Sequence, residues 1–235
     1  MAKNSNMKIL GITCGVLLLI AGIGLAVVAY LGYKQVQSIQ EGIKNPEQKV
    51  MEVLGTQRLP EGYFPNMGIS IPFVTDTAII SDKPNLDDKP PKLGDGLGFL
   101  YTLVKIGQEK NAVKLRAFFD GETDDPSALQ ENQFNMDLNA DDIIHRGIMD
   151  VNGMSVRFVV SSKGIENEHV EADGLATLFL FECNDDKMRF GIWFSPQAVE
   201  KTETGEVDLT GTVGDENNIR SFLSHFDLCG IEEKN

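Results

Sequence analysis

The densest set of potential metal ligands in this sequence lies in one short acidic segment. Residues 166–173 read Glu-Asn-Glu-His-Val-Glu-Ala-Asp, so four carboxylates surround the imidazole of His169. Calcium binds oxygen ligands of this kind, although the order of the residues does not match a calcium-binding loop. Because acidic connections are usually solvated surface loops, we assign neither a metal nor a cofactor to the segment.

Other patterns that support catalysis are incomplete. Residues 68–72 (GISIP) and 153–157 (GMSVR) each lack the last glycine of a nucleophile elbow. Residues 94–98 (GDGLG) are glycine-rich, but a strand pattern follows them instead of the helix whose N-terminus would hold a phosphate. We therefore predict no catalytic residues, and keep an enzyme with an unrecognised site as an alternative.

The histidines and paired acids favour structural roles. No zinc-binding spacing such as His-x-x-x-His or Cys-x-x-Cys includes His145, His169 or His225. We expect His145 to be a packed strand residue, and His225 to be exposed or bound to the backbone. The acid pairs at 141–142 and 185–186 fit helix caps and turns better than acid–base catalysis.

An uncharged stretch of 25 residues runs from Ile9 to Tyr33 between Lys8 and Lys34. As a helix it would be about 37 Å long, enough to cross a hydrocarbon core of about 30 Å with some tilt. A cleavable signal peptide, cut after residues 27–29 (VVA), is the alternative, but its apolar core is usually shorter. We predict an uncleaved transmembrane helix over 9–33, with the lipid bilayer as its partner.

Flanking charges set the expected topology. Lys3 and Lys8 precede the span, whereas Lys34 follows it, which favours a cytoplasmic N-terminus. We predict a cytoplasmic tail (1–8), a juxtamembrane helical stalk (34–55) and an extracytoplasmic domain (56–235), in a bacterial inner membrane with the domain in the periplasm. The small-residue pair Gly11 and Gly15 could form a helix-dimer face for self-association.

The exported part is strongly acidic. Removing Lys3 and Lys8 from the 21 Lys and Arg leaves 19 against 35 Asp and Glu, a net charge of −16. This charge disfavours a nucleic-acid role and suits a soluble surface or cationic partners. Cys183 and Cys229 are the only cysteine pair there. They could form a disulfide in an oxidising compartment, or remain two buried thiols.

Local patterns predict an α+β fold. Helices are expected over 46–54 and 215–228, the second with an apolar face of Ile219, Phe222, Leu223 and Phe226. The strands are expected at 68–80, 97–106, 112–119, 143–151, 154–161, 175–183 and 188–194, with turns at 108–111 and at Asn152-Gly153. Together they indicate one antiparallel sheet of six to eight strands with flanking helices.

Three short motifs carry a resemblance to known proteins. Residues 59–63 (LPEGY) after a single span and a short Pro-containing helix, residues 145–147 (HRG) and residues 219–223 (IRSFL) resemble bacterial anchored proteins of unknown function. The order of elements over 45–228 is similar to the PsbP-like fold of photosynthetic extrinsic subunits. The resemblance implies no catalytic residues and suggests an accessory or adaptor role.

These features predict a single-pass anchored, non-enzymatic protein that displays an acidic extracytoplasmic domain to an unknown protein partner. A membrane-tethered module for a lipid or other apolar ligand is the second interpretation. Its cavity would be lined by aromatic side chains: Phe99, Phe119, Phe158, Phe179 and Trp193. The same aromatics could instead simply form the core.

Overall fold

The structure is a computed structural model that describes most of the chain beyond the predicted stalk. The described residues are 45–84, 96–105, 109–125, 127, 129, 138, 140–162, 165–167, 170–172, 174–197 and 207–230. The predicted tail, transmembrane span and Gly11–Gly15 face lie outside these ranges. Within them, no helix has both the length and the apolar character needed to cross a membrane.

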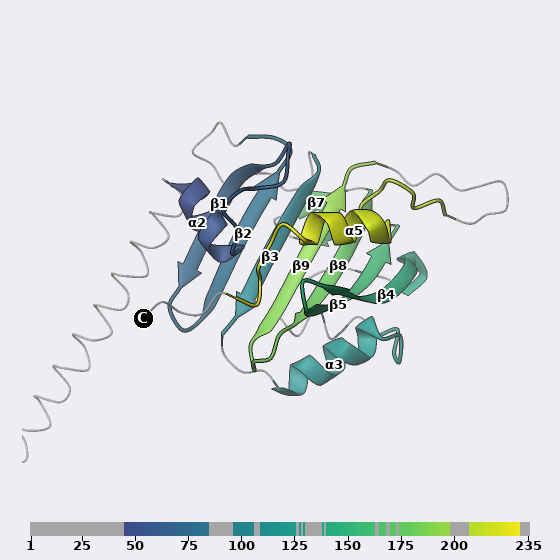
Figure 1. Cartoon of the computed structure of the whole chain (residues 1–235). Coiled ribbons are helices and arrows are strands. Elements are labelled where there is room, and N and C mark those ends of the chain that lie inside the picture. Colours follow the sequence, from purple (N-terminus) through teal and green to yellow (C-terminus); the bar gives the residue numbers. More distant parts are fainter. Residues whose placement is uncertain are drawn as a thin grey trace, which may run out of the picture.

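One antiparallel sheet organises the described residues, as Figure 1 shows. Its spatial order is β1-β2-β3-β9-β8-β5-β4. The strands are β1 (Phe64–Ile71), β2 (Thr75–Ser81), β3 (Gly98–Val104), β4 (Ile143–Val151), β5 (Met154–Ser161), β8 (Leu175–Glu182) and β9 (Met188–Ser195). The predicted α+β class with a single antiparallel sheet is confirmed.

The remaining elements are short. The helices are α2 (Pro46–Val53), α3 (Glu109–Phe119) and α5 (Glu216–Leu223), with a 3-10 turn at Ala140–Asp142. A separate two-stranded ribbon pairs β6 (Ile165–Asn167) with β7 (Val170–Ala172). The expected loop at 166–173 is therefore partly strand, and its side chains lie outside the description.

Two predicted hairpins are confirmed. Strands β4 and β5 turn at Asn152-Gly153, whose φ angles of 54° and 79° are both positive, and Val151 pairs with Met154. Positive φ at both central residues is what a two-residue hairpin turn of this type requires. Strands β8 and β9 form the second hairpin, and β9 is the fourth of seven strands. Both strands are interior strands of a sheet that is covered on both faces, which explains why each is apolar on both faces.

Residues 112–119 are helical, so the prediction of a strand there is wrong. They belong to α3, whose start also replaces the expected turn at 108–111 with helix from Glu109. The alternating apolar residues suggested a strand, but Val113 is 61% exposed, whereas Leu115, Phe118 and Phe119 are buried. The spacing of these three buried residues matches one helix face, and it outweighed the alternation.

Two other boundaries differ from expectation. The extended segment predicted over 68–80 is a hairpin of β1 and β2, with a turn at Pro72-Phe73. The helix predicted over 215–228 ends at Leu223, although Ile219, Phe222, Leu223 and Phe226 are all buried as expected. Phe226 lies in the non-helical segment after α5, and its ring is still buried in the core. Burial of a ring does not require a helical backbone.

The sheet is covered on both faces. Figure 1 shows α2 and α5 in front of it, and their buried side chains form one core cluster with β3, β5, β8 and β9 residues. The opposite face carries the second cluster, in which α3 packs with Leu129 and Leu138 against side chains such as Leu178 and Phe190. A layer on each face removes apolar sheet surface from water.

Candidate functional site

A cleft of about 580 Å³ opens between α5, the end of β9 and the chain that enters β1. We call it the α5 cleft. Its described lining includes aromatic rings at Tyr63, Trp193 and Phe222, and polar side chains from four separate segments. Those polar residues come from before β1, after β2, the end of β9 and the region around α5, four segments in all: Glu61, Asp82, Ser195, Gln197, Thr212, Asn218, Ser221 and His225.

Three aromatic rings form the floor of the α5 cleft. Trp193 stacks on Phe222 with ring centroids 4.2 Å apart and planes 8° from parallel. Tyr63 lies against the same phenylalanine at 5.2 Å, and its hydroxyl accepts a hydrogen bond of 2.7 Å from Trp193 Nε1. The floor is therefore rigid, because each ring is held by the other two.

A tight turn positions Tyr63. The amide of Tyr63 donates to the carbonyl of Pro60 at 3.1 Å, and Gly62 has a φ of 84°. Positive φ at the third residue is the requirement of a type II turn, which glycine meets without strain. The LPEGY motif is thus the turn that carries the ring onto Phe222.

A capped start positions the residues on α5. The Asp215 carboxylate accepts hydrogen bonds from the amides of Asn217 at 2.8 Å and Gly211 at 2.9 Å. These backbone hydrogen bonds lower the pKa of Asp215 below its ordinary value. The cap fixes the first turn of the helix, from which Asn218 and Ser221 line the cleft.

The rim of the α5 cleft is acidic. Glu61 and Asp82 contribute carboxylates, and none of the described lining residues is Lys or Arg. Burial raises the pKa of the Tyr63 hydroxyl, and the charge of Asp82 adds to this, against the hydrogen bond from Trp193. Tyr63 therefore stays a neutral hydroxyl whose proton can be donated to a ligand.

The imidazole of His225 in the cleft is bound to the backbone. His225 Nδ1 lies 2.9 Å from the carbonyl oxygen of Ser221, and a carbonyl can only accept, so this nitrogen carries the proton. His225 is exposed and bound to the backbone, as predicted. Two of the polar lining side chains, Glu61 and Asp82, are carboxylates that only accept, and they fit the N–H groups and cationic ends of a ligand.

The other histidine in the described part of the chain has a structural setting. His145 on β4 is partly buried, as expected, and its ring lies 5.5 Å from that of Phe158. Its Nε2 is 3.2 Å from a carboxylate oxygen of Glu216, which joins β4 to the start of α5. Among the described residues no group of three or more His, Cys, Asp or Glu could hold a metal.

The five aromatics proposed to line a ligand cavity do not share one face. Phe99, Phe158, Phe179 and Trp193 belong to the cluster under α5, whereas Phe119 lies in the cluster on the opposite face. Phe119 was expected on a strand, but it belongs to α3, which packs on the opposite face of the sheet. Phe99 also contacts Phe222 at 5.1 Å and Phe226 at 5.6 Å, so these rings fill the space beneath the helix.

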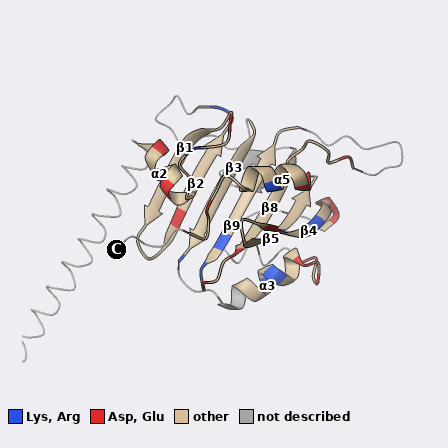
Figure 2. Cartoon of the chain, in the orientation of Figure 1, with Lys and Arg blue, Asp and Glu red and all other residues tan. Residues whose placement is uncertain are grey.

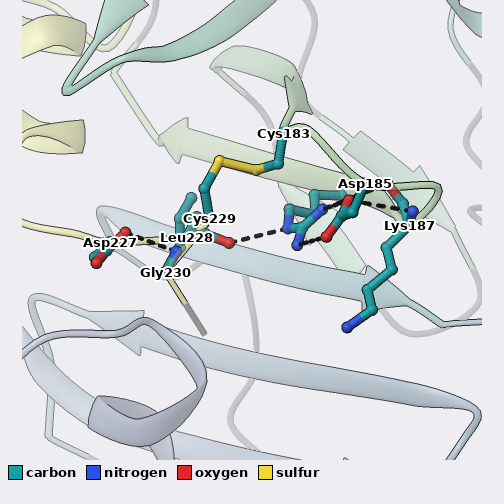
Figure 3. Close-up of a disulfide and its surroundings, with 8 residues drawn as sticks. Cys183, Asp185, Lys187, Asp227, Leu228, Cys229 and Gly230 are labelled. Atoms are coloured by element: carbon teal, nitrogen blue, oxygen red, sulfur yellow. Dashed lines mark hydrogen bonds and ion pairs between the residues drawn. A yellow bond between two sulfur atoms is a disulfide. The ribbon is translucent and has the colours of Figure 1, made fainter. Parts of the chain in front are cut away.

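Away from the α5 cleft, a group of charged residues lies beside the disulfide between Cys183 and Cys229, which is drawn in Figure 3. Their Cα atoms are 5.5 Å apart, and the bond ties the end of β8 to the C-terminal segment. Arg189 on β9 is 1% exposed and donates to the Leu228 carbonyl at 2.9 Å. Two further nitrogens of Arg189 each lie 2.6 Å from an Asp185 oxygen.

Sequence reasoning missed Arg189 because a lone arginine in an apolar strand gives no sign of its partners. Asp185 was predicted as a turn residue, which it is, but it also compensates the buried guanidinium. A charge within a strand that is otherwise apolar was the available signal, since buried charges need partners. The cluster fastens the C-terminal segment to the sheet, and Cys183 and Asp185 also line a separate cleft of about 570 Å³ beside α3.

Comparison of the chain with protein-family models, with curated proteins and with solved structures finds no match. The resemblance to the PsbP-like fold stays a prediction.

Proposed function

We propose that the chain is a single-pass, membrane-anchored, non-enzymatic module whose exported domain binds a cationic segment of a partner protein in the α5 cleft. Residues 9–33 supply the anchor, and residues 56–235 form the displayed domain. The observation that carries the proposal is the combination of a rigid aromatic floor with an acidic rim in one cleft.

The chemistry of the cleft selects the ligand class. Carboxylates of Glu61 and Asp82 attract Lys or Arg side chains, and the Tyr63 and Trp193 rings offer apolar surface to the stems of those side chains. The net charge of −16 on the exported part extends the same attraction beyond the cleft. Such a field mainly raises the rate at which a basic partner is captured.

The alternative functions have less support. A bound lipid would need an apolar cavity, but Phe99, Phe222 and Phe226 pack against one another beneath α5. An enzyme would need a nucleophile or acid placed against a base. In the described lining of the α5 cleft, the imidazole Nδ1 of His225 is instead engaged by backbone carbonyls.

A peptide-binding measurement tests the proposal. The full chain, held in nanodiscs of zwitterionic lipid, is titrated with a labelled peptide of alternating basic and apolar residues, and with its acidic counterpart. We expect the basic peptide to bind and the acidic one not to bind. Because two rim ion pairs of up to about 1 kcal/mol each are lost, the double variant Glu61→Gln, Asp82→Asn should weaken binding about tenfold.

The matched control is the double variant Glu122→Gln, Asp186→Asn, in which Asp186 is an exposed residue of the β8–β9 turn. Glu122 is exposed and follows α3, which packs on the opposite face of the sheet. Neither residue lines the α5 cleft, so these substitutions remove the same two charges from the domain without touching it. Equal weakening by the control would mean that net charge alone attracts the peptide, and binding of the acidic peptide would contradict the proposal outright.

A further inference from the structure

The turn between β1 and β2 exposes the most accessible large apolar side chain in the described part of the domain. Phe73 is 74% exposed and Val74 is 40% exposed, and Pro72 beside them is also exposed. We call residues 72–74 the hairpin tip. Single exposed apolar residues are common on protein surfaces, so exposure alone does not assign a role to the tip.

The backbone of the hairpin tip provides a second observation. Val74 donates to the Ile71 carbonyl at 3.1 Å, and Phe73 has a φ of 64°, which is the third position of a type II turn. Glycine is favoured at this position, and a bulky residue there is strained. The domain places Gly62 in the corresponding position of its Pro60–Tyr63 turn. At the hairpin tip the same position is occupied by Phe73, whose ring is not packed in the core of the domain.

The hairpin tip belongs to a stretch without charged residues, which is unusual for this acidic chain. Residues 62–75 contain no charged side chain. The first one after them, Asp76, pairs with Lys105 at 3.0 Å, and the two side chains are 11% and 13% exposed. Figure 2 shows β1 free of Asp, Glu, Lys and Arg along its whole length. The tip can therefore approach a lipid surface without desolvating an unpaired charge.

The tip also lies on the edge of the sheet that carries α2, the first described element after the proposed anchor. Helix α2 packs on β1, and a Cβ added to Gly68 would come within 2.7 Å of the Val50 amide nitrogen. Twelve residues, 34–45, separate the uncharged stretch from the start of α2. They can span about 40 Å when extended and about 18 Å as a helix, so the start of α2 can lie at most about 40 Å from the end of the proposed span.

We propose that the hairpin tip inserts Phe73 and Val74 into the interfacial layer of the membrane that holds residues 9–33. The inference rests on the proposed membrane anchor. It gives the domain a fixed orientation, with the β1 edge towards the lipid and the β4 edge away from it. Aromatic rings are favoured at the boundary between headgroups and acyl chains, where a short apolar tip can be buried without crossing the membrane.

A fluorescence measurement on the full chain tests this orientation. Phe73→Trp places a probe at the tip, and Ile148→Trp places one at a residue that is 60% exposed on β4, the opposite edge strand. Each variant is reconstituted in phosphatidylcholine vesicles with and without brominated acyl chains, which quench only nearby tryptophans. The unsubstituted chain reports the contribution of Trp193, which is subtracted.

We expect the Phe73→Trp probe to emit at shorter wavelength in vesicles than in detergent and to be quenched by the brominated lipid, while the Ile148→Trp probe is not. Val74→Trp provides a second tip probe if Phe73→Trp does not fold. Equal quenching at the two edges, or no quenching at the tip, would overturn the inference. Co-flotation of the chain with vesicles is scored separately, so failure of the anchor is distinguished from failure of the tip.

Discussion

Arg189 and Asp185 form a two-pronged ion pair in which the arginine is almost fully buried and the aspartate remains partly open to solvent. Two guanidinium nitrogens lie 2.6 Å from the two carboxylate oxygens, and the side chains are 1% and 31% exposed. A third nitrogen of Arg189 donates a hydrogen bond to the carbonyl of Leu228. One side chain on the central strand thus joins the β8–β9 turn to the C-terminal segment.

Asp185→Asn should destabilise the domain by about 3 kcal/mol, because it leaves the Arg189 charge buried without a counter-charge. Urea unfolding of the full chain in detergent, followed by tryptophan fluorescence, measures the change. The control is Asp186→Asn, which removes the neighbouring exposed carboxylate and should have little effect. Equal midpoints for the two variants would mean that Asp185 does not compensate the arginine.

Stability should also depend on pH through the same pair. Hydrogen bonds from Arg189, followed by its charge, lower the pKa of Asp185 below its ordinary value against the opposing effect of burial. A lowered folded-state pKa gives stability that is present above the unfolded value of about 3.9 and is lost as the pH falls through the folded value. The unsubstituted chain should therefore lose more stability than Asp185→Asn between about pH 5 and about pH 2.

Reducing the disulfide should destabilise the domain by about 4 kcal/mol on the chain-entropy model, given a sequence separation of 46 residues between Cys183 and Cys229. Denaturant unfolding with and without a reducing agent measures the loss. The Cys183→Ser, Cys229→Ser double variant should behave like the reduced chain and no longer respond to the reductant. Free thiols at both positions in protein isolated from the membrane would contradict the bond.

Phe222→Ala should cost about 3–5 kcal/mol, because it removes a buried ring from beneath α5. Phe222 is 5% exposed and contacts four rings, namely Tyr63, Phe99, Trp193 and Phe226. Thermal unfolding measures the effect, with the exposed neighbour Ser221→Ala as the control. An unchanged midpoint for Phe222→Ala would mean that this ring serves only the floor of the α5 cleft and does not stabilise the core.

The intact chain should behave as an integral membrane protein. Carbonate washing should not release it, and the mass of the mature protein should include residues 1–29. A reporter that is active only outside the cytoplasm, fused after Asn235, should be active. Recovery of a soluble form that begins near Tyr30 would instead identify residues 1–29 as a signal peptide.

The elements predicted best are those whose signal is local. Asn152-Gly153 specifies a hairpin turn because few other residue pairs accept positive φ twice in succession, and the apolar runs on either side supply its strands. The apolar stripe of α5 was likewise visible, although the end of the helix at Leu223 was not. Helix ends depend on caps and on what the next residues pack against, which a periodic pattern does not contain.

The sequence by itself determined the acidic character of the chain, the uncharged stretch from Ile9 to Tyr33, and the hairpins β4–β5 and β8–β9, because these depend on composition and on residues close together. Only the tertiary structure decided that 112–119 is a helix, since burial of Phe118 and Phe119 against the sheet overrides local alternation. The α5 cleft is likewise formed only in the folded domain, because its lining residues are far apart in the sequence. The Trp193–Tyr63 hydrogen bond joins residues 130 positions apart, and contacts at that separation are selected by the packing of the whole domain.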